Sequence, residues 1–259
     1  MDTLQRLRQD QVEGDGDYYD GDFIVTSVPQ VGVNYGGKTV QEFLNNIFRQ
    51  QTNPTATIST GTTVYERMAS GENMSVTLNY SVSRPVGCPA ITSVVIDGQT
   101  ETAPDIAEGN THSGSVSRAL PRNTNKTFTI TVVAGSKQTV NSISVLWRYA
   151  RYWGALSKNT NITDADILSL SGAGVGDGKE LNETRTRTYN GINGDGNYLV
   201  FVFPSSAGTP QFFINGLNST AFTKVRDNAF TNALGATYNV QAWVSNSPFN
   251  SPVAQFEIR

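Results

Sequence analysis

The sequence predicts a mainly β protein, in which two consecutive β-sandwiches follow an extended N-terminal arm and one amphipathic helix. Three observations lead to this expectation. Charged residues make up 16% of the 259 residues, below the usual value of about 25%, while 24 glycines and many Ser, Thr and Asn residues take their place. Twelve Phe, ten Tyr and many Val and Ile residues are available to form cores. Short runs with alternating apolar residues are separated by turns, which is typical of strands.

Residues 1–38 are predicted to form the extended arm. The arm has too few apolar residues to form a core alone, yet it has more aromatic residues than a plain linker. We therefore expect it to become ordered against a partner, with a disordered terminus as the alternative. Its acidic stretch Asp15–Asp22 is expected to face a basic surface. The predicted contact residues are Leu4, Leu7, Tyr18, Tyr19 and Phe23.

Residues 39–53 are predicted to form an amphipathic helix and a linker. Thr39 and Glu42 have the spacing of a capping box, and Asn53-Pro54 ends the segment. The apolar residues recur at helical spacing and so form one face, which must pack against the arm, the rest of the chain or another subunit. The residues of this face predicted to contact a partner are Phe43, Leu44, Ile47 and Phe48.

Residues 54–149 are predicted to form the first sandwich. Met74–Val82 has five apolar residues at every second position, and Asp97-Gly98 and Gly135-Ser136 are expected to be turns. About seven strands in fewer than 100 residues are typical of an immunoglobulin-like sandwich. Other apolar positions assigned to its strands are Ala56, Ile58, Val64, Ile91, Val94, Ile96, Phe128, Ile130, Val132, Val140, Ile143, Val145, Trp147 and Tyr149.

Residues 150–259 are predicted to form the second sandwich, with a short capped helix near 163–170. Gly172–Gly178 is expected to be a flexible loop. Both faces of Tyr198–Phe203 are apolar, which indicates a central strand that is covered on both sides. Other strands are expected at Thr184–Tyr189, Gln211–Ile214, Phe222–Val225, Tyr238–Val244 and Val253–Ile258.

Several classes of protein do not fit the composition. The net charge of −3 argues against nucleic-acid binding, and the sequence has no apolar run of about eighteen residues that could cross a membrane. The single cysteine, Cys88, excludes an intramolecular disulfide and a thiolate metal site. The first residues lack the apolar core of a secretory signal, so we expect synthesis in a cytoplasm.

Four segments carry a resemblance to a known group of proteins. They are Thr92–Gly98, Arg148–Ala155, Tyr198–Pro204 and Tyr238–Trp243, and they follow an apolar helix that ends in Asn-Pro. Over residues 36–259 the chain resembles the two-sandwich structural proteins in virions of tailed bacteriophages, especially podovirus-like phages of Bacteroidetes hosts, including the crAss-like group.

This resemblance implies a structural component of the virion, located on the head fibre, neck or tail, without a catalytic motif. It also implies contacts with other virion proteins and a homo-oligomer, either a trimer or a ring that matches sixfold or twelvefold symmetry. The alternative function is an adhesin that binds a host-surface glycan or receptor.

No catalytic residue and no cofactor are predicted. The single histidine, His112, is expected in a polar loop without a nucleophile beside it, and Cys88 is expected to be a partly buried structural thiol. A glycosidase needs two carboxylates that flank a sugar cleft. The available ones are expected to serve turns and helix starts instead: Asp164, Asp166, Asp177, Glu180, Glu183, Asp195 and Asp227.

No metal site is predicted either. Asn193–Asn197 and Asp15–Asp22 offer oxygen ligands that suit calcium, but both lack the closing glutamate of a calcium loop, so turn chemistry is the preferred interpretation. Gly172–Gly178 lacks the Gly-Lys-Ser/Thr sequence of a phosphate-binding loop.

Four aromatic residues near predicted loops allow two interpretations. Their rings could stack on a saccharide, or they could be buried where the two sandwiches meet, and the second interpretation is preferred. Arg148 and Arg151 are expected to lie over these rings as cation–π partners. The four aromatic residues are Tyr152, Trp153, Trp243 and Phe249.

Overall fold

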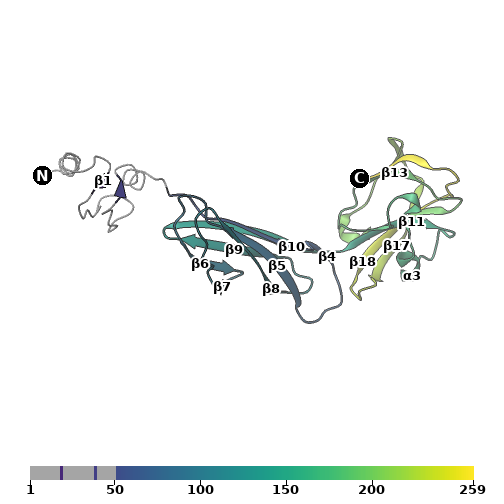
Figure 1. Cartoon of the computed structure of the whole chain (residues 1–259). Helices are drawn as coiled ribbons and strands as arrows, with labels where there is room; N and C mark the ends of the chain where they lie inside the picture. Colours follow the sequence, from purple (N-terminus) through teal and green to yellow (C-terminus); the bar gives the residue numbers. More distant parts are fainter. Residues whose placement is uncertain (1–17, 20–37, 40–50) are drawn as a thin grey trace.

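The described part of the chain is mainly β. The computed structural model describes Tyr18–Tyr19, Lys38–Thr39 and residues 51–259 (Figure 1). Strand β1 (Tyr18–Tyr19) pairs antiparallel with β2 (Lys38–Thr39). The other described strands form two pairs of sheets that lie end to end, the first from residues 55–148 and the second from residues 150–258. That these pairs are separate domains stays a prediction.

The first sheet pair consists of a three-stranded and a five-stranded sheet. The three-stranded sheet has the order β3-β5-β8, with β3 (Thr55–Thr60), β5 (Met74–Ser83) and β8 (Thr111–Leu120). The five-stranded sheet has the order β4-β10-β9-β6-β7, with β4 (Val64–Glu66), β6 (Ile91–Ile96), β7 (Gln99–Glu101), β9 (Lys126–Ala134) and β10 (Lys137–Arg148).

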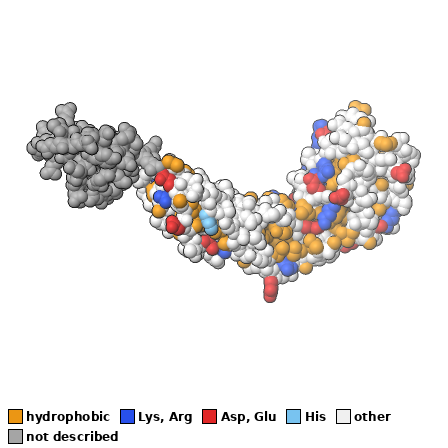
Figure 2. Space-filling model, viewed as in Figure 1, with side chains coloured by type: hydrophobic (Ala, Val, Ile, Leu, Met, Phe, Trp, Pro, Cys, Tyr) orange, Lys and Arg blue, Asp and Glu red, His pale blue; other side chains and the backbone are white. Residues whose placement is uncertain are grey.

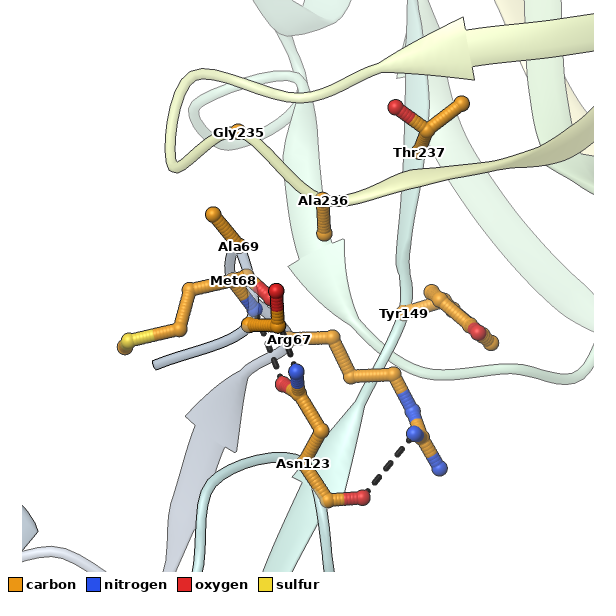
Figure 3. Close-up of a pocket in the computed structure, with 9 residues that line it drawn as sticks. Arg67, Met68, Ala69, Asn123, Tyr149, Gly235, Ala236 and Thr237 are labelled. Carbon is orange, nitrogen blue, oxygen red and sulfur yellow. Dashed lines mark hydrogen bonds between the residues drawn. The ribbon is translucent and has the colours of Figure 1, made fainter. Parts of the chain in front are cut away.

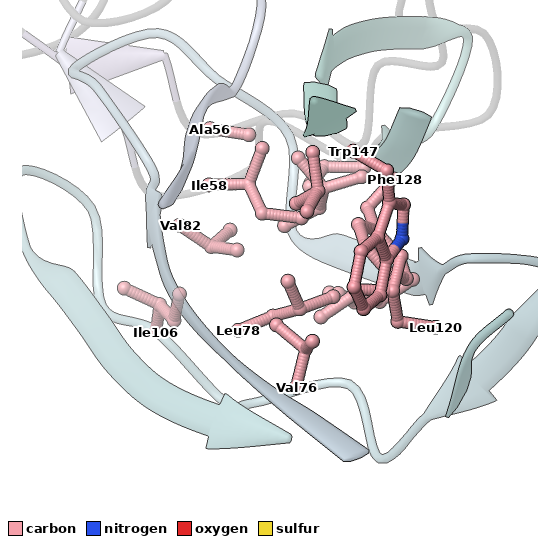
Figure 4. Close-up of a cluster of buried hydrophobic side chains, with 14 residues drawn as sticks. Ala56, Ile58, Val76, Leu78, Val82, Ile106, Leu120, Phe128 and Trp147 are labelled. Atoms are coloured by element: carbon pink, nitrogen blue, oxygen red, sulfur yellow. The ribbon is translucent and has the colours of Figure 1, made fainter. Parts of the chain in front are cut away.

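One apolar core lies between these two sheets (Figure 4). The alternation predicted for β5 is confirmed, because Val76, Leu78 and Val82 are buried while Thr77 and Asn79 are exposed. The five-stranded sheet contributes Phe128 and Trp147 to the core from the opposite side. Each large apolar side chain buried in this way stabilises the fold by about 1.5–3 kcal/mol.

Two predicted turns of this sheet pair are confirmed. Asp97 and Gly98 have φ angles of 53° and 76° in the hairpin between β6 and β7, and Gly135 has a φ of 58° between β9 and β10. These left-handed angles suit the tight turn of a hairpin.

Two expectations about this sheet pair are wrong. His112 lies in strand β8 and not in a loop. Val140 is 57% exposed, because the inward positions near the end of β10 are the odd-numbered ones, such as Val145 and Trp147.

The second sheet pair consists of a five-stranded and a four-stranded sheet. The five-stranded sheet has the order β12-β11-β14-β18-β17, with β11 (Ala150–Leu156), β12 (Lys179–Leu181), β14 (Tyr198–Pro204), β17 (Phe222–Thr231) and β18 (Thr237–Ser245). The four-stranded sheet has the order β13-β19-β15-β16, with β13 (Arg187–Ile192), β15 (Phe212–Ile214), β16 (Leu217–Ser219) and β19 (Val253–Ile258).

Strand β14 is central and buried on both faces, as predicted. On one face Phe201 stacks on Phe256 of the four-stranded sheet, with ring centroids 4.6 Å apart. On the other face Val200 and Val202 share a core with Ile167 of helix α3 (Asp164–Leu168). The five-stranded sheet is therefore covered by a second sheet on one side and by a helix on the other.

Helix α3 is the single α-helix within the described residues, and it begins as predicted. Thr163 is the N-cap, and its side chain and that of Asp166 complete a reciprocal capping box. No helix in the described part of the chain is long and apolar enough to cross a membrane.

The glycine-rich loop after α3 is held in place, so the expectation of a flexible loop is wrong. It contains the 3₁₀ turn η1 (Gly172–Gly174), and a second 3₁₀ turn, η2 (Ser205–Ala207), follows β14. The Trp153 backbone N–H and indole N–H donate to the carbonyls of Gly178 and Val175, both at 2.8 Å. Gly178 has a φ of 76° and leaves no room for a side chain. The loop therefore closes over the Trp153 ring.

Candidate functional site

The candidate site is the joint where the two sheet pairs meet. Strand β4 pairs in parallel with the end of β10, and this pairing places Glu66 opposite Arg148. The chain then passes through Tyr149 into β11, which belongs to the second sheet pair. Glu66 therefore stands at the boundary, and it is only 8% exposed.

The Glu66 carboxylate is bound by three donors from the second sheet pair. Its Oε1 accepts hydrogen bonds from the Tyr152 hydroxyl at 3.2 Å and from Asn232 Nδ2 at 3.0 Å. Its Oε2 accepts from Lys179 Nζ at 2.5 Å. A buried carboxylate is costly unless it is paired and hydrogen-bonded. These three contacts satisfy Glu66, and all of them link the two sheet pairs.

The environment keeps the tyrosine at this site protonated. Burial raises the pKa of Tyr152 well above its usual range, and the nearby Tyr238 and Glu66 add to this effect. Burial also raises the pKa of Tyr238, whose hydroxyl donates to the Ala150 carbonyl at 3.4 Å. Tyr152 therefore acts as a neutral hydrogen-bond donor.

A second set of charges lies beside this carboxylate. The Arg67 guanidinium lies over the Tyr149 ring, 4.7 Å from its centroid, and donates from Nη1 to the Asn123 carbonyl at 3.0 Å. Arg148 Nη1 lies 3.2 Å from Glu183 Oε2, and the Tyr149 backbone N–H donates to Glu183 Oε1 at 3.2 Å. Through Glu183, the segment after β12 is thus joined to Arg148 at the end of β10, to Tyr149 and to Arg67 after β4.

Further hydrogen bonds tie the turn between β17 and β18 to the segment after β4. The Ala69 N–H donates to the Leu234 carbonyl at 2.9 Å, and Asn232 Nδ2 donates to the Arg67 carbonyl at 2.8 Å. The Asn232 Oδ1 accepts from two backbone N–H groups of its own turn, those of Leu234 and Ala236. Asn232 thus shapes the turn between β17 and β18 and also ties that turn to the first sheet pair.

A pocket of about 330 Å³ lies in this joint (Figure 3). Asn123 binds both backbone polar groups of Met68, and Arg67 extends between Asn123 and Tyr149. Asn123 therefore binds Arg67 and Met68 within the lining, Ala69 binds Leu234 across the joint, and this arrangement can hold two bodies together. The lining residues are Arg67, Met68, Ala69, Ser70, Asn123, Tyr149, Gly235, Ala236 and Thr237.

Only part of the predicted contact surface lies in the described residues. Tyr18 and Tyr19 form β1, of which only the backbone pairing is described. Leu4, Leu7, Phe23, Phe43, Leu44, Ile47 and Phe48 lie outside the described residues, and so do Asp15–Asp17 and Asp20–Asp22 of the acidic stretch. The predictions for these residues stay predictions.

The four aromatic residues have different positions. Tyr152 lies in the joint, as the preferred interpretation predicts. Trp153 is 1% exposed in the core of the second sheet pair, and Trp243 and Phe249 are half-buried and pack against that core. Burial is therefore the correct interpretation for Tyr152 and Trp153, but Trp153 does not contribute to the joint.

The expected cation–π partners are wrong. Arg187, and not Arg148 or Arg151, lies over the Trp153 ring, at 4.1 Å from its centroid. Arg151 is 5% exposed and binds Glu180 Oε2 at 2.6 Å, and burial lowers its pKa.

The carboxylates of the second sheet pair mostly have structural partners. Asp164 binds Arg226, Asp166 caps α3, Asp227 binds Lys224, Glu180 binds Arg151 and Arg187, and Glu183 binds Arg67 and Arg148. At Asn193–Asn197 the side chains bind backbone groups within the same turn, as the turn interpretation predicts. The described residues contain no cluster of three or more His, Cys, Asp or Glu side chains that could hold a metal ion.

The two remaining reactive side chains lie in the first sheet pair. Cys88 is a free thiol that is only 3% exposed, so it is more fully buried than predicted. Burial raises its pKa. His112 is exposed, and its ring centroid lies 6.3 Å from that of Tyr80.

Solved structures that resemble the chain include two titin structures, both distant. No known protein family matches the sequence, and no curated protein matches it. A structure of titin domains z1z2 in complex with telethonin has 10% identity and a TM-score of 0.23, over 77% of this chain and 84% of that chain. The titin immunoglobulin tandem A164-A165 has 9% identity and a TM-score of 0.20, over 76% and 84%. Such low TM-scores carry no argument about this chain.

Proposed function

We propose that the chain is a structural component of a tailed-phage virion, located on the head fibre, neck or tail. In this proposal the two sheet pairs are two β-sandwich domains, the first of them immunoglobulin-like, and the N-terminal arm and helix attach them to other virion proteins. The protein acts as a homo-oligomer, without catalysis or a cofactor. The order of the four resembling segments along the sequence supports the proposal.

The observation that carries the proposal is the construction of the joint. Flexible two-domain proteins have linkers with few contacts, whereas here a buried carboxylate accepts hydrogen bonds from three separate segments of the second sheet pair. A part that must hold a fixed distance between two attachment points needs this kind of connection. The joint thus favours a stiff spacer.

The direct test uses the phage that encodes the chain. Deletion of residues 1–35 is expected to remove the protein from purified particles, as measured by quantitative mass spectrometry, while the expressed protein stays folded. Particles that contain the truncated protein at full occupancy would show that the arm is not the anchor. Complete absence of the wild-type protein from particles would reject the virion proposal itself.

A second test addresses the predicted helix. The double substitution Phe43→Asp with Ile47→Asp is expected to block incorporation into particles and to leave the isolated chain folded, because the apolar face would dock on another subunit. Loss of folding in the isolated chain would show instead that this face belongs to the chain's own core. Circular dichroism and mass spectrometry of particles distinguish the two outcomes.

One observation favours the alternative function, a glycan-binding adhesin. The outer face of the three-stranded sheet has a depression of about 470 Å³, lined without any charged side chain. Hydroxyl and amide groups gathered on one surface suit a neutral saccharide. In Figure 2 the surface of the first sheet pair is largely white. White marks the backbone and the side chains that are neither hydrophobic nor charged. The lining residues are Thr57, Ser59, Asn79, Tyr80, Ser81, Ser113, Gly114 and Ser115.

A glycan array with the full chain tests this alternative. Asn79→Ala is expected to weaken binding of a neutral saccharide at least tenfold, since Asn79 is the one amide in the depression. Thr129→Ala, an exposed position of the other sheet, is the matched control and should leave binding unchanged. An array without any bound glycan would reject the adhesin.

A further inference from the structure

The edge strands of this protein differ in how they are protected against pairing with another strand. Exposed edges are usually short, charged, bulged or covered. Strand β17 has a bulge between Lys224 and Arg226, and β4, β7, β12 and β16 have three residues each. The carbonyls beside and within β3 are capped, because Thr139 and Asn141 donate to Pro54 and Ala56. Strand β13 contains Gly191, with a φ of 74°, where the pairing skips a residue.

Strand β8 is an edge without such protection. It has ten residues, its register against β5 is unbroken from Thr111 to Leu120, and among the described strands it pairs with β5 alone. Its one permanently charged side chain, Arg118, is buried and binds Glu101 and the Ile96 carbonyl. The outer positions of this edge are therefore neutral.

The hydrogen bonds around β8 show which of its backbone groups point outward. The Asn110 carbonyl, just before β8, accepts from the Arg84 N–H beside β5, so even-numbered residues face β5. Carbonyl directions alternate along a strand, so odd-numbered residues face away from β5. In agreement, side chains of Arg118 and Lys126 cap the carbonyls of Ser117 and Ala119. These side chains leave the outward edge open along residues 111–117. The one exception within this range is the Ser117 carbonyl, to which Arg118 donates.

This open segment is symmetric about Gly114. If two copies pair antiparallel about that residue, Ser113 of one copy lies opposite Ser115 of the other, and the outward N–H and C=O groups of both have no partner among the described residues. Gly114 lacks room for a side chain, since a Cβ there would lie 2.6 Å from the Tyr80 hydroxyl oxygen. Two glycines would then meet on the axis, each covered by a tyrosine ring. His112 of one copy would lie opposite Val116 of the other.

We propose that β8 is a self-association surface, on which a second copy of this chain pairs antiparallel about Gly114. The two three-stranded sheets then form one continuous sheet. The occupant is a second copy because the open segment is uncharged and self-complementary, so two copies meet there without repulsion. A two-fold contact closes on two copies. The inference therefore gives a dimer in place of the trimer or ring that the resemblance implies, and it does not depend on the virion proposal.

Charge pairs across the axis provide the test. In the S113K/S115K variant of the full chain, lysines lie directly opposite each other, whereas in the S113K/S115E variant each lysine lies opposite a glutamate. Both pairs of substitutions are on the solvent face, at exposed positions, so each variant should stay folded. Analytical ultracentrifugation is expected to show a concentration-dependent dimer for the wild type and for S113K/S115E. The dissociation constant of S113K/S115K should be larger by about tenfold or more.

Three results would overturn the proposal. One is a wild-type chain that stays monomeric at the highest concentration at which it is soluble. Another is a wild-type trimer or larger ring without a dimer. The third is equal dissociation constants for the two charge variants, which would place the contact elsewhere or in another register. A circular dichroism spectrum that matches the wild type is required for both variants, and Ser115→Ala, which keeps the backbone N–H, should dimerise like the wild type.

Discussion

Single residues decide how the two sheet pairs are connected, and Glu66 has the largest role. It is a buried charge whose partners all lie across the boundary, at sequence separations of 86, 113 and 166 residues. The sequence around Glu66 gives no sign of this role. A single glutamate after an apolar dipeptide is a common pattern, and its three partners are distant in the chain. This part of the candidate site could not be predicted from the sequence.

Removal of the Glu66 side chain should destabilise the protein strongly. Glu66→Ala leaves the Tyr152 hydroxyl, the Asn232 amide and the Lys179 ammonium without their shared acceptor, at a cost of about 2–4 kcal/mol in the free energy of unfolding. Urea unfolding followed by tryptophan fluorescence measures this change. The matched control is Glu72→Ala, an exposed glutamate in the same segment of the chain, which should change stability by less than about 0.5 kcal/mol. An equal effect of both substitutions would contradict the assigned role of Glu66.

Two glycines with similar backbone angles should respond differently to alanine. Gly178 and Gly216 have φ angles of 76° and 81°. A Cβ on Gly178 would lie 2.5 Å from the Leu170 carbonyl oxygen, whereas a Cβ on Gly216 would meet nothing within 4 Å. Gly216→Ala should therefore cost only the left-handed strain of about 1–2 kcal/mol, and Gly178→Ala should cost more. Thermal unfolding of the two variants measures the difference, and equal melting temperatures would refute it.

At the scale of elements, alternation predicted the strands that have one buried and one exposed face. Strand β5 is the clearest example, and β14 was correctly predicted as central because both its faces are apolar. Strand β8 was not predicted, because an edge strand rich in serine needs few apolar residues. Strand β11 was not predicted as a strand either, since its first five residues are all buried and show no alternation. The pattern therefore fails for an edge strand with few apolar residues, and for a buried strand such as β11 whose apolar run is interrupted by Arg151 and Gly154.

The start of helix α3 provides a pH-dependent prediction. Hydrogen bonds from Lys158 and Thr163 lower the pKa of Asp166 from 3.8 to about 2. A carboxyl group with a lowered pKa in the folded state stabilises the protein above its unfolded pKa, and this contribution disappears as the pH falls from about 4 to about 2. The stability difference between the wild type and Asp166→Asn should therefore shrink in this range. Denaturation curves between pH 6 and pH 2.5 test it, and a constant difference would contradict the assignment.

At the scale of the whole molecule, the joint makes two sheet pairs into one elongated body. Small-angle X-ray scattering measures how much the maximum dimension of the monomer varies between molecules. For the wild type this distribution should be narrow, because the joint holds the two sheet pairs in one arrangement. The variant with Glu66→Ala and Asn232→Ala should give a broader one, because it loses the links that Glu66 and Asn232 make across the joint while both sheet pairs keep their cores. The control with Glu72→Ala and Asn73→Ala, both exposed, should match the wild type. Identical scattering of all three proteins would show that the joint does not determine the shape.

The long sequence separations across the joint also determine the order in which its parts can fold during translation. The last strand of the first sheet pair ends at Arg148, whereas Asn232 is made 166 residues after Glu66. From Arg148 to Asn232 the ribosome adds 84 residues, which takes roughly 4–17 seconds at about 5–20 residues per second. During this time the first sheet pair can fold while the Glu66 carboxylate is still hydrated, and its partners arrive in the order Tyr152, Lys179, Asn232. Closure of the joint is therefore a late event of biosynthesis, and a nascent chain that stops before residue 232 carries an incomplete joint.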